Sequence, residues 1–160
     1  MIMKEDLSDS GLLSYICIKA KAEKKKISFA NGCFDIIHAG HVQFLKEAKQ
    51  LAEVVIVGIN SDESIKFLKG LDRPLNNLEA RSIVLDSIRY VDYVIQFNGN
   101  RVSHLLEFIK PDFFVKGGDY TLDKVERGEF DTCMKNKIKI IIANKYGEVS
   151  TTNLINKIRS

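Results

Sequence analysis

Apolar residues in this chain follow two patterns that alternate from one end to the other. Short runs rich in valine, isoleucine and phenylalanine predict strands, and longer segments with apolar residues every three or four positions predict helices. The predicted strands are 27–30, 54–59, 93–96, 113–116 and 138–142. The predicted helices are 7–26, 39–51, a short one capped at 60–62 and ending near 68, then 78–89, 101–110, 123–135 and 151–158.

Strands that alternate with helices favour a parallel sheet covered on both faces. We therefore predict an α/β fold, a Rossmann-like, doubly wound parallel sheet of five strands with helices on both faces. The nearly unbroken β-branched run at 54–59 is typical of a strand buried on both sides. The length of 160 residues suits a single domain, in which an N-terminal helix (1–26) precedes the main α/β unit (27–160).

Composition and charge narrow the class of protein. Apolar residues make up 45% of the chain and charged residues 28%, which is ordinary for a globular domain. The net charge of +3 is too small for a dedicated nucleic-acid binder, so we expect no nucleic-acid partner. It is compatible with one local site for an anionic ligand.

The cysteines and the start of the chain indicate a cytoplasmic protein. Cys17, Cys33 and Cys133 form no close pair, which argues against a disulfide framework and against a cysteine zinc site. The first residues lack the basic start and apolar run of a signal peptide. No apolar stretch approaches the ~18 residues of a membrane span, so we expect no membrane partner.

Segment 31–41 combines two histidines with two glycines directly after the first predicted strand. His38 and His41 lie three residues apart at the start of a helix, so both imidazoles can donate to one anion. The helix N-terminus adds unpaired N–H groups and a positive dipole end. Gly32 permits close approach of the backbone to a ligand, and Gly40 leaves room for a phosphate or a flat base. The pattern predicts a phosphate site.

Other interpretations of this segment stay open. The histidines can be structural hydrogen-bonding residues, or they can ligate a metal together with Asp35, although the sequence offers no HExxH pattern or cysteine partner. Cys33 can be a nucleophile, but a small packed thiol is favoured because nothing places a base beside it. The chain contains no Walker GxxxxGK[ST] motif.

The segment carries an HxGH signature, through which the chain resembles the nucleotidyltransferase superfamily. Its longer motifs are similar to those of D-glycero-β-D-manno-heptose 1-phosphate adenylyltransferases. These motifs are NGCFDIIHAGH at 31–41, INSD at 59–62, KGLDRPLN at 69–76, PDFFVKGGDY at 111–120 and STTN at 150–153. The resemblance covers about residues 27 to 158, which makes 27–160 the expected nucleotidyltransferase domain.

The resemblance implies transfer of AMP from ATP to the sugar 1-phosphate, which gives ADP-heptose for the lipopolysaccharide core and releases pyrophosphate. The attacking group is already a phosphate anion, so alignment and charge neutralisation can carry the reaction. We expect Mg²⁺, because it neutralises polyphosphate and binds mainly through the phosphates of ATP, and we expect no metal site of the protein's own. The resemblance also implies a homodimer.

The resemblance assigns roles to individual residues. His38, His41 and Lys69 are expected to act in catalysis on the triphosphate. The residues expected to bind the nucleotide are Gly32, Cys33, Phe34, Gly40, Arg81, Lys116, Gly117, Ser150, Thr151 and Thr152. The residues expected to bind the second substrate are Asp35, Asp62 and Asp119.

Several of these roles have alternatives. Ser150 can be a plain helix N-cap, and Asp35 can serve a turn or a water on Mg²⁺. Asp119 can meet sugar hydroxyls or an adenine edge. At the level of the whole protein, the alternatives are a cytidylyltransferase for an alditol or amino-alcohol phosphate and a non-catalytic nucleotide-binding module.

Overall fold

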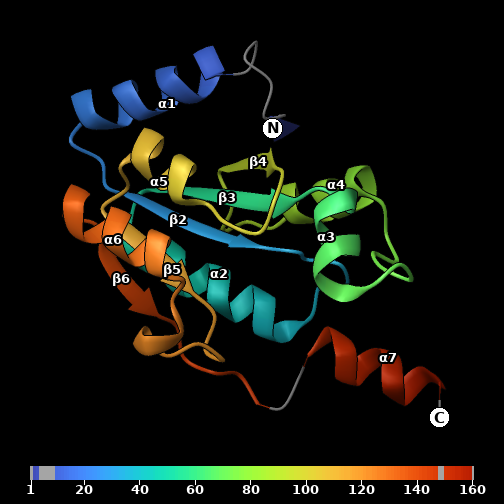
Figure 1. Ribbon diagram of the computed structural model, residues 1–160. Helices are drawn as coiled ribbons and strands as arrows, with labels where there is room; N and C mark the ends of the chain where they lie inside the picture. The colour runs from blue at the N-terminus through green and yellow to red at the C-terminus, as the bar shows by residue number, and fades with distance from the viewer. Residues whose placement is uncertain (1, 4–9, 148–149, 160) are drawn as a thin grey trace.

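A computed structural model describes residues 2–3, 10–147 and 150–159 of the chain (Figure 1). The strands are β1 (Ile2–Met3), β2 (Ile27–Gly32), β3 (Val54–Asn60), β4 (Tyr93–Phe97), β5 (Phe113–Lys116) and β6 (Lys139–Ile142). The helices are α1 (Ser10–Ala22), α2 (Ala39–Leu51), α3 (Asp62–Lys69), α4 (Leu78–Asp86), α5 (Ser103–Ile109), α6 (Arg127–Asn136) and α7 (Thr151–Arg159). Within the described ranges, no helix has the length and apolar character needed to cross a bilayer.

The strands form one parallel sheet in the order β1-β4-β3-β2-β5-β6. The predicted α/β class and all five predicted strands are confirmed. The sheet also has a sixth strand, β1, in which Ile2 pairs with Val94 at one edge. Two residues are too few to produce a periodic pattern, so the sequence analysis did not detect this strand.

Helices cover both faces of the sheet (Figure 1). Ile27 and Phe29 of β2 point into a core shared with α1, α5 and α6, whereas Ala30 points into the core beneath α2 and α4. This alternation follows from the two-residue period of a strand. Ser28 is also fully buried on the α2 side, where its hydroxyl donates to the carbonyl of Ala48 at 2.9 Å.

The N-terminal helix belongs to the same core as the sheet. Leu13, Ile16, Cys17 and Ala20 of α1 are buried against residues of β2, β3 and α5. The helix is shorter than predicted because Lys24 turns into the left-handed region with φ 56°. Residues 7–9 of the predicted helix lie outside the described residues.

Among the other predicted boundaries that change, two have clear local reasons. Strand β2 continues two residues beyond the prediction, because Asn31 and Gly32 still pair with β3. The predicted helix at 123–135 is instead a 3-10 turn (Leu122–Lys124) followed by α6. Helix α6 begins at Arg127, after the N-cap Glu126, whose side chain accepts a hydrogen bond from the N–H of Glu129.

The sheet order places a switch point beside its central strand. From β2 the chain moves outward to β3 and β4, then returns to the other side of β2 as β5. In open α/β sheets, ligands bind beyond the carboxyl ends of the strands at such a point. The loop from β2 to α2 and the end of β5 meet there.

Candidate active site

A cavity of about 780 Å³ opens at the carboxyl ends of β2 and β5. This volume is within the range of small-molecule sites. Its lining contains most of the residues singled out in the sequence, from segments far apart in the chain. They are Gly32, Cys33, Phe34, His38, Gly40, His41, Lys69, Lys116, Gly117, Asp119, Ser150, Thr151 and Thr152.

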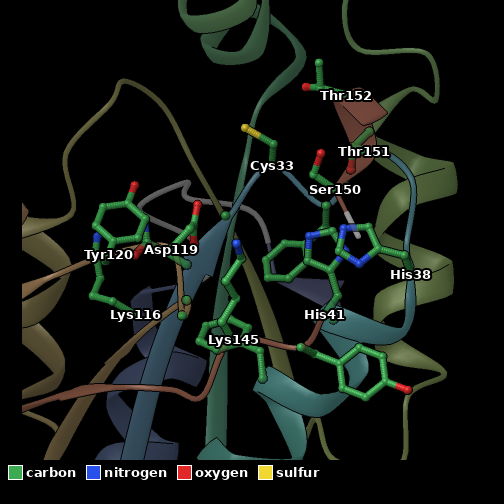
Figure 2. Close-up of a pocket in the computed structure, with 18 of the residues that line it drawn as sticks. Cys33, His38, His41, Lys116, Asp119, Tyr120, Lys145, Ser150, Thr151 and Thr152 are labelled. Carbon is green, nitrogen blue, oxygen red and sulfur yellow. The ribbon is translucent and has the colours of Figure 1, made fainter. Parts of the chain in front are cut away.

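His38 and His41 form a stacked pair on one side of the cavity. Their ring centroids are 3.9 Å apart, and the ring of Phe34 lies 5.2 Å from that of His41. Figure 2 shows the two imidazoles beneath Ser150, with Lys116, Asp119 and Tyr120 on the other side. The Nδ1 atoms of both histidines are buried and have no hydrogen-bond partner in the protein. Buried polar atoms are normally satisfied, so these two atoms mark a place where a polar ligand fits.

Both histidines are held neutral by their surroundings. Burial, followed by repulsion from His38 and Lys69, lowers the pKa of His41 to about 4. Burial also lowers the pKa of His38. A neutral imidazole has one donor and one acceptor nitrogen, so each ring can donate a hydrogen bond to a phosphate. An anion bound beside them would raise both pKa values.

The backbone at the start of α2 faces the same cavity. His38 is the N-cap of α2, and its side chain makes no capping hydrogen bond, so the first N–H groups of the helix keep their capacity for a ligand. Phe34 adopts a left-handed φ of 49°, which is uncommon for a bulky residue. Strained backbone of this kind tends to occur at functional sites.

A second helix N-terminus borders the cavity. Ser150 accepts a hydrogen bond from the N–H of Asn153 at 3.0 Å, so it has the N-cap role that the sequence analysis left open. Thr151 donates to the carbonyl of Ile36 at 3.3 Å, which joins the start of α7 to the loop before α2. The N-termini of α2 and α7 therefore lie at one cavity, where their dipoles favour an anion.

Lys116 forms a buried ion pair with Glu129. The Nζ of Lys116 lies 3.0 Å from Oε2 of Glu129, and both side chains are at least nine-tenths buried. The rings of Phe114 and Tyr120 each lie 4.8 Å from the same Nζ. Glu129 also accepts from the N–H of Val102, which precedes α5. The sequence analysis missed Glu129, because no local pattern distinguishes it from the other glutamates.

Residues 144–147, which we call the strap, form a wall of the cavity that the sequence analysis also missed. A Cβ on Gly118 would lie 2.4 Å from the backbone nitrogen of Lys145, so the strap requires glycine at that position. Asn144 is tied to α2, because its N–H donates to Glu47 at 2.9 Å. In the sequence, the paired glycines at 117–118 were the only sign that two backbone segments approach each other closely here.

Three residues that were predicted to contact ligands make polar contacts within the protein. Arg81, Asp35 and Asp62 are absent from the cavity lining. The guanidinium of Arg81 is buried, and it donates to the carbonyls of Cys33 and Asn60 and to the carboxylate of Asp62. Asp35 is also buried and accepts from Arg73. Arg81 and Asp35 therefore stabilise the segments that form the cavity wall, without lining the cavity themselves.

Cys33 lies in the cavity wall as a protonated thiol. Burial is the main cause that raises its pKa, and its Sγ lies 3.8 Å from Oδ1 of Asn60. A thiol in this state is a poor nucleophile. The structure therefore favours the packed-thiol interpretation of the sequence.

The fold and the cavity define a class of protein. A switch-point cavity with two helix N-termini, neutral imidazoles and Lys69 is typical of an α/β protein that binds the phosphates of a nucleotide. Residues 29–157 match the cytidylyltransferase-like family, and the chain belongs to this family.

Curated relatives point to a narrower group within this family. The chain is 44% identical over 140 residues to the bifunctional protein HldE of Alcanivorax borkumensis, covering 88% of this chain and 29% of that protein. It is 42% identical over 141 residues to the bifunctional protein HldE of Haemophilus influenzae, with the same coverage of both chains. The chain thus spans about a third of the length of the curated relatives it matches.

Solved structures share the fold. The lipopolysaccharide core biosynthesis protein of Thermoplasma volcanium superposes with a TM-score of 0.65 at 25% identity, covering 76% of this chain and 98% of that chain. Pantoate-beta-alanine ligase of Francisella tularensis superposes with a TM-score of 0.63 at 18% identity, covering 97% of this chain and 73% of that chain. The second likeness concerns the fold alone.

Proposed function

We propose that this protein transfers AMP from ATP to D-glycero-β-D-manno-heptose 1-phosphate. A phosphate oxygen of the sugar phosphate attacks the α-phosphorus of ATP in line and forms a new P–O bond. The bond from that phosphorus to the bridging oxygen breaks, and pyrophosphate leaves with the electron pair. The observation that best supports this proposal is the stacked pair His38 and His41 at a helix N-terminus, in one cavity with Lys69 and the start of α7.

The reaction needs little proton transfer from the protein. The attacking phosphate is anionic at neutral pH, so no strong base is required. His38 and His41 would donate hydrogen bonds to the transferring phosphoryl group, on which charge develops in the transition state. Lys69 would neutralise the leaving pyrophosphate, and the backbone at 32–34 would hold the α-phosphate. Gly40, Thr151 and Thr152 also line the cavity.

The donor set suits Mg²⁺ that arrives with ATP. Among the described residues, no three His, Cys, Asp or Glu side chains form a cluster for a resident ion. The carboxylate of Asp119 lines the cavity and can serve an ion held mainly by phosphate oxygens and water. Bound Mg²⁺ would neutralise charge on the polyphosphate.

Several observations support heptose as the second substrate. The motifs at 69–76 and 111–120 resemble those of heptose 1-phosphate adenylyltransferases. A solved structure with the same fold is described as a lipopolysaccharide core biosynthesis protein. Asp119, on the opposite side of the cavity from the histidines, would meet the sugar or the adenine. The same resemblance underlies the further proposal that the protein is a homodimer. The unpaired cysteines support the proposal that it acts in the cytoplasm.

Incubation with Mg²⁺, heptose 1-phosphate and each of ATP, CTP, GTP and UTP tests the proposal. We expect ADP-heptose by mass spectrometry, with pyrophosphate release only in the ATP reaction. A product only with CTP would point to the cytidylyltransferase alternative. His41→Ala serves as the inactive control, because the variant lacks one of the two proposed phosphate donors.

A further inference from the structure

The carboxylate of Asp35 is fully engaged by the loop that follows α3. Arg73 Nε donates to Oδ2 at 2.7 Å, and the N–H of Leu75 donates to Oδ1 at 2.8 Å. The N–H of Asn76 donates to Oδ1 at 3.0 Å, and the Asn76 side chain donates to the carbonyl of Asp35 at 2.8 Å. The Asp35 side chain is 1% exposed. Because a carboxylate has about four acceptor positions, little capacity is left for a ligand.

Lys69 is the last residue of α3 and directly precedes this loop. It lies in a run of seven residues, 66–72, that are all exposed, and we call this run the arm. Phe67 and Leu71 of the arm are 83% and 88% exposed, so they are not packed against the body. The arm is held at one end by Ile65, which is fully buried, and at the other end by the contacts of residues 73–76 with Asp35.

Asp35 also belongs to the loop that presents the histidines, because it precedes His38 by three residues. It therefore joins the loop of His38 to the second anchor of the arm. We propose that Asp35 is a positioning residue that fixes Lys69 relative to the histidine pair; the proposal rests on the proposed function, in which Lys69 binds the phosphates. Asp35 acts through the arm and does not touch the substrate.

A double-mutant cycle tests this role. Asp35→Asn keeps the size of the side chain but turns an NH₂ group toward the donors of the loop. Lys69→Ala should lower kcat about 100-fold, as expected for loss of one charged transition-state contact. Asp35→Asn should lower kcat about 10-fold, because a misplaced contact is only partly lost. The double variant should lie within about threefold of Lys69→Ala alone, since coupled residues are not additive.

Asp92→Asn is the matched control. Like Asp35, Asp92 accepts from a basic side chain, that of Lys49, and from a backbone N–H, that of Val55, but it lies at the opposite ends of the strands. This variant should keep kcat within about twofold of the wild type, since surface-type ion pairs away from a site have small effects. Amide hydrogen exchange across 66–76 should rise in Asp35→Asn and stay unchanged in Asp92→Asn.

Multiplicative losses, with the double variant about 1,000-fold below the wild type, would overturn the proposal. An effect confined to the KM of the sugar phosphate would also overturn it, since it would indicate direct contact. If Asp35→Asn does not fold, Arg73→Ala removes the other partner of the same ion pair. This variant then replaces Asp35→Asn in the double-mutant cycle with Lys69→Ala.

The cycle also separates this proposal from the proposed function. If the wild type forms no product with heptose 1-phosphate, the choice of acceptor fails, and the cycle is read on the Kd of Mg·ATP. The same non-additivity in Kd would support positioning of Lys69 by Asp35. Independent losses in Kd would reject it.

Discussion

The imidazole rings of His38 and His41 lie 3.9 Å apart at the start of α2, an arrangement that two protonated rings would oppose. Burial lowers the pKa of both rings, and repulsion from His38 lowers that of His41 further, so the pair is neutral at pH 7. The neutral rings can therefore donate hydrogen bonds to a phosphate, and they can take up protons once that anion is bound.

The neutral state of His41 predicts a pH-dependent stability without ligand. Its pKa is about 4 in the folded protein and near 6.5 in the unfolded chain. Between these values the unfolded state binds more protons, so stability should fall as the pH is lowered from 6.5 to 4. His41→Asn should flatten this part of the curve. Thermal unfolding at several pH values measures it, and equal slopes for both proteins would contradict the pKa shift.

Loss of either histidine should reduce catalysis more than binding. His38→Ala and His41→Ala should each lower kcat about 100-fold or more, because the donors act where charge develops in the transition state. His104→Ala, on the exposed side of α5, should keep wild-type kinetics. Pyrophosphate release gives kcat and KM for all three variants. A rise in KM alone would place the histidines in ground-state binding.

The ion pair between Lys116 and Glu129 should be costly to break. Glu129→Gln should lower the free energy of unfolding by about 3 kcal/mol, because a buried ammonium loses its counter-charge. The double variant Lys116→Met/Glu129→Leu should recover most of that stability and remain impaired in catalysis. Urea unfolding and pyrophosphate release separate the two effects.

An exposed ion pair on the same helix provides the control for that prediction. Arg127 and Asp131 of α6 lie 3.0 Å apart, with side chains 86% and 57% exposed. Asp131→Asn should leave unfolding nearly unchanged, since exposed pairs contribute little. Similar losses for Glu129→Gln and Asp131→Asn would show that burial of the Lys116 pair carries no special cost.

The strap should respond to a single methyl group. Gly118→Ala places a Cβ 2.4 Å from the Lys145 nitrogen, so the backbone of the strap must move and the cavity wall moves with it. We expect a loss of about 1 to 3 kcal/mol in stability and a higher KM for ATP. Gly11→Ala on α1 meets no atom within 4 Å and should be neutral or slightly stabilising. Calorimetry and steady-state kinetics compare the two variants.

Much of the fold could be predicted because burial and backbone geometry leave local patterns. The extent of α2 at 39–51 and of β5 at 113–116 matches the prediction, since apolar spacing and Pro111 define them locally. Helix α1 was predicted too long, because a lysine can take the left-handed conformation at Lys24 without any signal in the sequence.

The sequence by itself determined the parallel α/β class, the location of the histidine pair after β2, and the position of the motif residues just after the strands. Those features depend on residues that are neighbours along the chain, so the spacing of apolar residues and the short motifs reveal them. Only the tertiary structure decided that Asp35 and Arg81 brace the site, that Glu129 holds Lys116, and that the strap crosses Gly118. These relationships join segments brought together by the strand order, and a side chain's partner across such a distance leaves no trace in its local sequence.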